Sequence, residues 1–359
     1  MHHLTVKIMQ LYRNLLILVT LAFVNFLFYI HVFSYIATEK AEIEQLKKLL
    51  ELKYRDLHKE PAPRDESSEG DVQESVAEPV EEVRQMKLID PRKDFRFTLN
   101  NEYACFNLDG TYRRVFLLVV VFSIHEHFEQ RKLIRRSWGS VEIVNDRNIV
   151  TKFLLGRVHN SGLQTLVEEE NDQYDDIIIG DFDDTYKNLT LKTIQTLKWV
   201  TNYCSHAKYV MKTDDDMFVH YKNIVNFLAG NTSRRDYAVG YYMKTKPIRN
   251  VRSKWYMPKD VYPHDKYPPF LSGTGYIMSV DLVMRMNSVS SDVAFLHLED
   301  VFAGTLWQKL GVKPQGNKRF HNAPVKFSYC AYKKLFTSHT SPNFVRVWRE
   351  LKTTENKKC

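Results

Sequence analysis

Three adjacent carboxylates, Asp214, Asp215 and Asp216, are the residues whose types and spacing most clearly could do chemistry. They directly follow the apolar run 209–211, which is typical of a buried strand. Like charges side by side repel each other unless a cation or hydrogen-bond donors compensate. Oxygen ligands favour magnesium or manganese, which complete their shells with phosphate oxygens and water. The pattern therefore predicts a metal–diphosphate site, and the alternative is a solvated acidic turn.

A second acidic pair, Glu299 and Asp300, lies in the segment LEDVFAG at 298–304, whose apolar residues indicate the start of a helix. An acid at this position could stabilise the helix N-terminus as a cap. It could instead act as a general base at the rim of a pocket. Taken alone, the pattern favours the cap.

Two glycines, Gly273 and Gly275, lie in the run FLSGTGYIMS at 270–279. The run superficially resembles a glycine-rich phosphate loop, but it lacks both G-x-x-x-x-G-K-[ST] and G-x-G-x-x-G. We therefore expect the two glycines to let the backbone approach a ligand closely, because they carry no Cβ atom.

A basic and aromatic group lies in the segment RKLIRRSWG at 131–139. Arg131 and Arg135 are four residues apart and therefore share one face of a predicted helix. They could bind an anionic ligand or be solvated. Trp138 could pack in the core or stack on a base or a sugar.

The elements that must position these groups alternate along the chain. Continuous apolar, β-branched runs predict buried strands at 115–122, 149–155, 177–179 and 209–211. Helical patterns lie between them, and one of these helices follows Asp183 and Asp184 as its expected N-terminal caps. Alternating strands and helices predict an α/β fold with a largely parallel sheet. In such sheets, ligands bind beyond the carboxyl ends of the strands.

The composition is that of a globular protein built in pieces. The 359 residues include 44% hydrophobic residues, 26% charged residues and four cysteines, which excludes a wholly disordered chain, collagen and a disulfide-dense scaffold. The net charge of +8 is mild, and we expect no nucleic-acid partner. Residues 61–85 contain eight acidic and two basic residues and no aromatic residue, which predicts an extended linker.

An uncharged apolar span, 15–36, predicts a transmembrane signal anchor. At ~1.5 Å per residue it covers about 33 Å, enough for the hydrocarbon core of a membrane. Lys7 and Arg13 precede the span and acidic residues follow it, so the positive-inside rule places the tail 1–14 in the cytosol. A buried core helix and a cleaved signal peptide are the alternatives.

Residues 37–90 are predicted to form a lumenal stem, followed by a catalytic domain at 91–359. The first part of the stem has heptad-like leucines, which predict a juxtamembrane helix or a weak homodimer contact. Glycosylation sequons at Asn188 and Asn231 fit a lumenal domain. Four cysteines allow three complete pairings, and the sequence does not choose among them or decide whether Cys359 is free.

Together these motifs resemble the β-1,3-galactosyltransferase / β-1,3-N-acetylglucosaminyltransferase family. The resemblance covers 91–351 and is carried, in order, by the segments RKLIRRSWG, DFDDTYKNLTLKT, KTDDDMFV, YPPFLSGTGY and LEDVFAG. The tail, anchor, stem and large domain are likewise similar to the plan of a Golgi glycosyltransferase. The resemblance implies a Rossmann-like GT-A fold, a UDP-sugar donor and manganese as cofactor, with magnesium as the alternative.

The resemblance also implies roles for individual residues. Those that match the metal-binding segments are Asp214, Asp216 and His339. Those expected to hold the donor are Arg131, Arg135, Trp138, Asp183, Lys212 and Asp215. Those assigned to the substrate loop are Gly273, Gly275 and Glu299. Asp300 matches the second acid of the family's E-D-V motif, its proposed base.

The implied reaction is an inverting transfer of galactose from UDP-galactose to the 3-hydroxyl of a glycan on a lipid or a protein, at the Golgi membrane. Glu299 before Asp300 is more similar to galactosyltransferase members than the D-D-V of many N-acetylglucosaminyltransferases. UDP-GlcNAc or UDP-GalNAc as donor is an alternative, as is an inactive lectin-like or chaperone-like relative. A phosphohydrolase would need a further nucleophile motif, which we do not find.

The predicted topology can be tested on sealed microsomes that contain the full chain. Protease added outside should spare everything from residue 37 onward, because only the short tail 1–14 is expected to face the cytosol. An immunoblot against the large domain gives the readout. Degradation of that domain in intact vesicles would reverse the predicted orientation.

Overall fold

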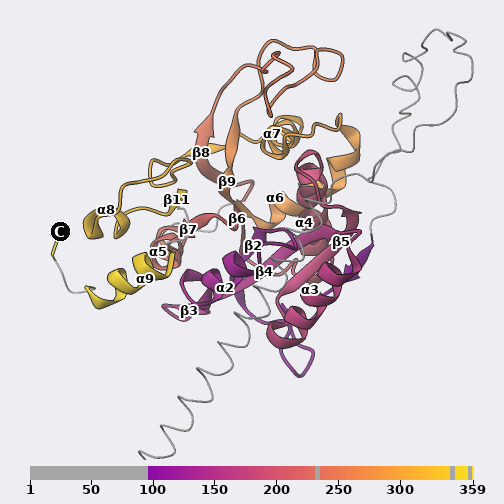
Figure 1. Cartoon of the computed structure of the whole chain (residues 1–359). Helices are drawn as coiled ribbons and strands as arrows, with labels where there is room; N and C mark the ends of the chain where they lie inside the picture. The colour runs from indigo at the N-terminus through magenta and orange to yellow at the C-terminus, as the bar shows by residue number, and fades with distance from the viewer. Residues whose placement is uncertain (1–95, 231–234, 340–343, 355–357) are drawn as a thin grey trace, which may run out of the picture. The chain divides into compact units, whose positions relative to one another are not determined.

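The computed structural model describes residues 96–230, 235–339, 344–354 and 358–359 (Figure 1). All of them belong to one compact unit, Val80–Cys359. The predicted anchor at 15–36, the stem and Asn231 lie outside these residues. Among the residues that are described, no helix is both long and apolar enough to cross a membrane.

The central sheet is mixed, and its core is parallel. In the described part of the chain its strand order is β1-β5-β4-β2-β6-β9-β8-β10, with β3 paired to β4. The strands are β1 (Phe97–Leu99), β2 (Val115–Phe122), β3 (Ile143–Val144), β4 (Arg147–Arg157), β5 (Ile177–Asp183), β6 (Tyr209–Asp214), β8 (Ala238–Met243), β9 (Phe270–Ser279) and β10 (Gln315–Gly316). The four strands β5, β4, β2 and β6 run parallel, which confirms the predicted α/β class with a mainly parallel centre.

A small second sheet pairs β7 (Met217–Val219) with β11 (Thr337–His339) in antiparallel register. Short 3₁₀ turns are η1 (Trp138–Ser140), η2 (Tyr186–Asn188) and η3 (Ser290–Asp292). The helices are α2 (Phe128–Arg135), α3 (Ser161–Tyr174), α4 (Leu189–Tyr203), α5 (Tyr221–Ala229), α6 (Val280–Val289), α7 (Glu299–Lys309), α8 (Tyr329–Tyr332) and α9 (Phe344–Thr353).

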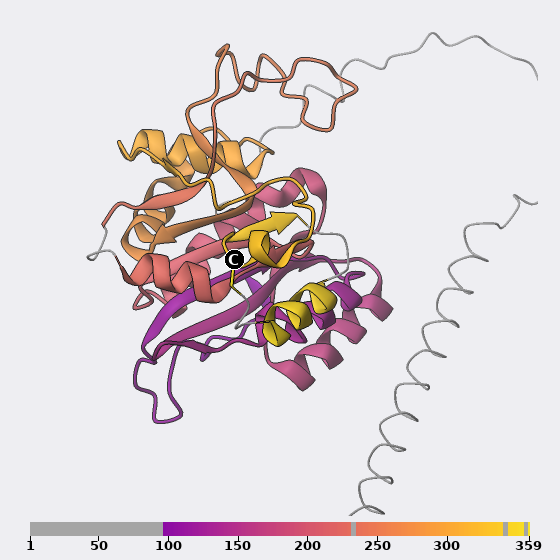
Figure 2. The same cartoon turned by 90° about the vertical axis from the view of Figure 1, so that its left-hand side faces the viewer.

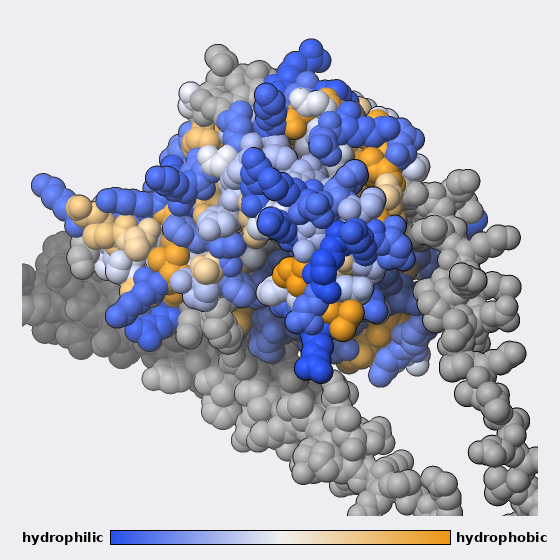
Figure 3. Space-filling view, turned by 90° about the horizontal axis from the view of Figure 1, so that it is seen from above, coloured by the Kyte–Doolittle hydropathy of each residue, from blue (hydrophilic) through white to orange (hydrophobic). Residues whose placement is uncertain are grey.

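Two helical layers cover the two faces of the sheet (Figures 1 and 2). Along β2, Leu118 and Val120 join the core cluster that contains the apolar residues of α4, α6 and α7. Leu117, Val119 and Val121 join the opposite cluster, with residues of α2, α3, α5 and α9. A strand buried on both faces needs apolar side chains at every position, which explains the continuous run that predicted β2. Seen from above, the outer surface is mostly hydrophilic with small apolar patches (Figure 3).

The expected caps of α4 were wrong. The capping position belongs to Asn188, whose side chain donates to the carbonyl oxygen of Asp183. Asp184 instead accepts a hydrogen bond from the Gly156 backbone N–H at 2.7 Å and pairs with Lys192 Nζ at 2.8 Å. The reason is that β5 runs on to Asp183 and η2 then separates both acids from the helix.

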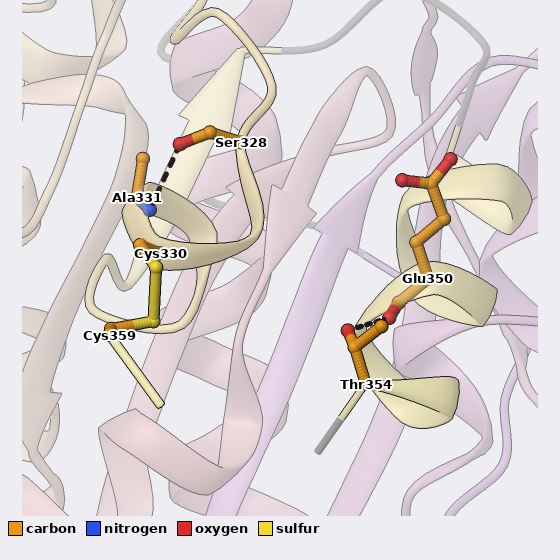
Figure 4. The surroundings of a disulfide bond; sticks show 6 residues. All are labelled: Ser328, Cys330, Ala331, Glu350, Thr354 and Cys359. Carbon is orange, nitrogen blue, oxygen red and sulfur yellow. Dashed lines mark hydrogen bonds between the residues drawn. A yellow bond between two sulfur atoms is a disulfide. The ribbon is translucent and has the colours of Figure 1, made fainter. Parts of the chain in front are cut away.

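All four cysteines are paired, as Cys105–Cys204 and Cys330–Cys359, each with a Cα–Cα distance of 5.5 Å. The first bond joins the segment before β2 to the end of α4. The second joins α8 to the end of the sequence, and Ser328 Oγ caps α8 by accepting from the Ala331 N–H (Figure 4). Cys359 is therefore not free.

Candidate active site

Three of the segments singled out in the sequence meet at the carboxyl end of β6. Asp214 ends β6 and lies opposite Phe122, the last residue of β2. Strand β9 runs antiparallel to β6 and places Gly275 opposite Thr213. Helix α7 begins at Glu299 and contacts β9. The acidic run, the glycine run and the start of α7 therefore share the edge where ligands bind in open α/β sheets.

Lys212 is the buried centre of this arrangement, with 3% of its side chain exposed. Its Nζ atom lies 2.7 Å from Asp214 Oδ1 and 2.9 Å from Glu299 Oε1, and it also donates to the carbonyl oxygen of Gly273. Burial acts to lower the pKa of Lys212, but the charges of Asp214 and Glu299 raise it well above its ordinary value. The ammonium therefore stays protonated and neutralises the acids around it.

Glu299 is held in place from both sides. Its Oε1 atom faces Lys212, and its Oε2 atom accepts hydrogen bonds from Thr193 Oγ1 and the Tyr276 hydroxyl, both at 3.1 Å. With 5% of its side chain exposed, Glu299 is a buried scaffold residue. Its assignment to the substrate loop stays a prediction.

The two glycines of β9 differ in how closely other residues approach them. A Cβ atom on Gly273 would lie 2.4 Å from Glu299 Oε1, so a side chain there would displace the buried carboxylate. A Cβ atom on Gly275 would meet its neighbours at 3.5 Å, which is ordinary van der Waals contact. Glu299 therefore approaches the backbone of Gly273 closely, and of the two glycines only Gly273 requires the absence of a Cβ atom. The expected close approach of a ligand stays a prediction.

Asp300 lies next to this cluster but outside it. Its Oδ1 atom accepts the Val301 N–H at 2.8 Å, and its Oδ2 atom accepts the Gly273 N–H at 3.4 Å. Burial raises the pKa of Asp300 to about 7, and the Glu299 charge acts in the same direction. Leu298, not Asp300, occupies the capping position of α7. Asp300 is thus a carboxyl group whose proton is exchanged near neutral pH, as a general base requires.

Asp216 and His339 form a second, more exposed pair. The pairing of β7 with β11 places His339 opposite Met217, and its Nε2 atom lies 2.7 Å from Asp216 Oδ2. The Asp214 carboxylate is turned toward Lys212 instead. Across the described residues, no three or more His, Cys, Asp and Glu side chains gather closely enough to hold a metal ion. The structure therefore brings together two of the three predicted ligands.

Two polar pairs that the sequence analysis missed, one partly exposed and one buried, support these groups. His127 Nδ1, in the loop after β2, lies 2.8 Å from Asp215 Oδ2, and this hydrogen bond raises the pKa of His127. Lys192 Nζ, from α4, contacts Asp184 and the carbonyl oxygen of Ser123. Nothing in the local sequence marks either residue, because each partner lies in a different element.

Arg131 is engaged within the protein, and its contact with a donor stays a prediction. Its side chain is 0% exposed and forms a bidentate pair with Glu170 of α3, with Nη2–Oε2 at 2.6 Å. It also donates to Ser123 Oγ and to the carbonyl oxygens of Ile124 and His125. Its donors are directed to the loop after β2, so Arg131 positions that loop.

Arg135 and Trp138 are also engaged within the protein. Arg135 pairs with Glu170 at 2.6 Å and with Asp176 at 2.7 Å. Trp138 is fully buried and packs edge-on against Tyr221, with ring centroids 5.5 Å apart. Neither side chain is directed at the carboxyl edge. Trp138 packs in the core, which was one of its two expected roles, and Arg135 forms ion pairs within the protein.

Asp183 lies on the same edge of the sheet but away from the Lys212 cluster. It pairs with Arg157 at 3.2 Å and with His159 at 3.3 Å. Strands β4 and β2 separate β5 from β6, and at ~4.8 Å per strand the two ends are roughly 14 Å apart. Its contact with a donor stays a prediction, as does that of Asp215.

A cavity of about 650 Å³ lies at the opposite, amino-terminal edge of the sheet. Arg113, Lys152 and Asp175 are among its lining residues. None of the residues described at the carboxyl edge lines it, so the cavity is separate from the candidate site.

Comparisons with known proteins identify the class and then the family. The galactosyltransferase family profile matches residues 129–318. The chain is 42% identical over 248 residues to "Beta-1,3-galactosyltransferase 1" of Mus musculus, covering 68% of this chain and 76% of that protein. It is 38% identical over 275 residues to "Beta-1,3-galactosyltransferase 2" of Homo sapiens, covering 74% of this chain and 64% of that protein.

Among solved structures, a WbbM bifunctional glycosyltransferase aligns over 63% of this chain and 45% of its own. The TM-score is 0.37 at 12% identity, so we draw no argument from it. The sequence comparisons make this chain a glycosyltransferase. It belongs to the β-1,3-galactosyltransferase family, which confirms the resemblance seen in the sequence.

Replacing Arg131 with lysine separates a positioning role from a donor contact. Arg131→Lys keeps the charge but loses the bidentate geometry, so we expect a stability loss of about 2–3 kcal/mol, measured by thermal unfolding. Isothermal titration should show little change in UDP affinity below the melting transition. Arg136→Lys, at an exposed neighbouring position, is the control. An unchanged melting temperature with weakened UDP binding would instead support a direct contact between Arg131 and the donor.

Proposed function

We propose that this glycosyltransferase transfers galactose from UDP-galactose to the 3-hydroxyl of a glycan acceptor, with inversion, to form a β-1,3 linkage. The names of its relatives support the sugar and the linkage. The observation that carries the mechanism is Asp300, a carboxyl group with a pKa of about 7 beside Glu299, which is ion-paired with Lys212. We assign the GT-A fold to the mixed sheet on the strength of the family.

The proposed reaction is one in-line displacement. The acceptor 3-hydroxyl oxygen bonds to C1 of galactose while the bond from C1 to the UDP phosphate oxygen breaks. The hydroxyl proton passes to Asp300, and the electron pair of the broken bond leaves with UDP. Because the sugar in UDP-galactose is α-linked, a single displacement gives the β product without a covalent enzyme intermediate. General base catalysis of this kind contributes typically ~10²–10⁴-fold.

A divalent cation fits the exposed pair Asp216 and His339. A carboxylate oxygen and an imidazole nitrogen are acceptable ligands for manganese, and both side chains are about half exposed, so water and phosphate oxygens could complete the shell. When bound, the cation would offset the charge that develops on the leaving diphosphate. Asp214 is the proposed third ligand, and it would have to turn from Lys212. Magnesium is the alternative ion.

The location proposed for the enzyme is the Golgi membrane, as a single-pass type II protein with its catalytic domain in the lumen. The uncharged span 15–36 and the charge distribution around it support this proposal. Lumenal oxidising conditions are consistent with two disulfide bonds. The acceptor is proposed to be a glycan on a membrane lipid or a glycoprotein.

A donor screen tests the proposed sugar. The full-length chain in detergent, with manganese, should release UDP fastest from UDP-galactose when methyl β-glycosides are supplied as acceptors. UDP-GlcNAc and UDP-GalNAc are the competing donors. Faster turnover of either would show that the donor sugar is an N-acetylhexosamine rather than galactose. No turnover with any donor would favour an inactive lectin-like relative.

Chelation tests the cation. EDTA should abolish transfer and manganese should restore it, because the charged diphosphate cannot approach the three acids at 214–216 without a cation. Asp216→Ala should not be rescued, and His339→Ala should shift the manganese titration to higher concentration. Asp236→Ala, an acid outside the site, is the control. Full activity in excess EDTA would remove the metal from the mechanism.

Replacing Asp300 with asparagine tests the base. Asp300→Asn keeps the acceptor oxygen but cannot take a proton, so we expect a loss of at least ~100-fold in kcat with near wild-type melting temperature and UDP binding. Because only the ionised form accepts a proton and the pKa of Asp300 is about 7, wild-type kcat/KM should fall as pH drops below 7. A low melting temperature with retained kcat would instead make Asp300 structural.

A further inference from the structure

Two half-exposed aromatic side chains, Tyr186 of η2 and Trp255 of the loop 244–269, lie together although they are distant in sequence. Their exposed fractions are 47% and 49%. The Trp255 side chain interacts with the Tyr186 hydroxyl. Lys254 Nζ lies 4.7 Å from the centre of the Trp255 ring and 5.9 Å from that of Tyr186. The pair therefore forms one aromatic surface open to solvent.

This aromatic surface lies beside Asp300. Thr190, at the start of α4 after η2, donates from Oγ1 to the carbonyl oxygen of Leu296 at 2.5 Å, which ties η2 to the segment leading into α7. Burial raises the pKa of Tyr186, and the next largest cause is the charge of Asp300. Helix α4 follows η2 directly and packs against α7, so η2 with Tyr186 lies near the helix that carries Asp300.

The loop that carries Trp255 is held in a fixed shape by its own polar contacts. Arg249 donates four hydrogen bonds, of 2.6–3.0 Å, to backbone carbonyl oxygens of the loop. These oxygens belong to Met257, Pro258, Tyr262 and His264. The loop projects beyond β8 and β9 on the side of α7 (Figure 1). Trp255 is thus presented on a preordered loop, which lowers the entropic cost of binding a ligand to it.

We propose that Tyr186 and Trp255 form the acceptor platform, on which the apolar C–H face of a terminal pyranoside stacks with its 3-hydroxyl toward Asp300. The faces of aromatic rings are electron-rich and attract the weakly positive C–H groups of a sugar ring. A serine or threonine side chain offers no such face. The platform therefore selects a glycan acceptor rather than a protein hydroxyl, and this assignment rests on the proposed transferase function.

The test separates the KM for the acceptor from the KM for the donor, using the full-length chain in detergent with UDP-galactose. The acceptor probes are methyl β-N-acetylglucosaminide and methyl β-galactoside. Trp255→Ala and Tyr186→Ala should each raise the acceptor KM about tenfold while the KM for UDP-galactose stays within about twofold. Trp255→Phe, which keeps an aromatic face, should restore most of the affinity.

Tyr103→Ala is the matched control, because Tyr103 is an exposed aromatic residue at the opposite edge of the sheet. It should leave both KM values unchanged. An unchanged acceptor KM in both platform variants, or a rise in the donor KM alone, would overturn the platform. A thermal unfolding curve for each variant shows whether it is folded.

A binding measurement keeps the platform testable if the proposed function itself fails. If the wild-type chain turns over no UDP-sugar, methyl β-N-acetylglucosaminide should still quench tryptophan fluorescence in the wild type and not in Trp255→Phe. Quenching of equal size in both proteins, or none in either, would contradict the platform. Failure of turnover alone contradicts only the proposed transfer.

Discussion

The buried ammonium of Lys212 is the interaction on which the rest of the site depends. It lies in contact with two carboxylates, Asp214 and Glu299, and with the Gly273 carbonyl oxygen. Breaking such a buried pair by removing one partner typically costs ~3–5 kcal/mol, because the other charge is left uncompensated. With Lys212 in place, the acidic end of β6, the start of α7 and Gly273 of β9 are fixed to each other, and Glu299 is used as scaffold rather than as a base.

Similar buried pairs fix the other loops at the same edge. Arg131 with Glu170 holds the loop after β2, and Lys192 with Asp184 holds the end of β5. The side chains that a substrate can reach, Asp300 and the pair Asp216–His339, lie outside these ion pairs. This division has a chemical reason, since a carboxylate in an ion pair with a neighbouring cation is a weaker base. Asp300 remains outside the Lys212 ion pairs, and Asp216 pairs with the half-exposed His339.

The sequence predicted much of this arrangement and missed its internal partners. The apolar run of β2 and the acids after β6 were correctly located, because continuous apolar runs and charge clusters are local signals. The sequence did not indicate that Arg131 pairs with Glu170 or that Trp138 is buried, since a motif cannot distinguish a side chain that binds a ligand from one that pairs with a distant acid or fills the core. The contacts of Glu299 with Lys212 and with Gly273 depend on tertiary packing, which the spacing of residues in the sequence does not indicate. The disulfide pairing was likewise undetermined for the same reason.

The central claim is that Asp300 is the proton acceptor, beside a Glu299 carboxylate that is ion-paired with Lys212. Its most direct test is a carbon NMR titration of the Asp300 carboxyl group in protein labelled with ¹³C-aspartate, with the Asp300→Asn spectrum used for assignment. The account predicts a midpoint near the pKa of about 7 that burial gives this group. A midpoint near the ordinary aspartate value of ~3.9 would contradict it.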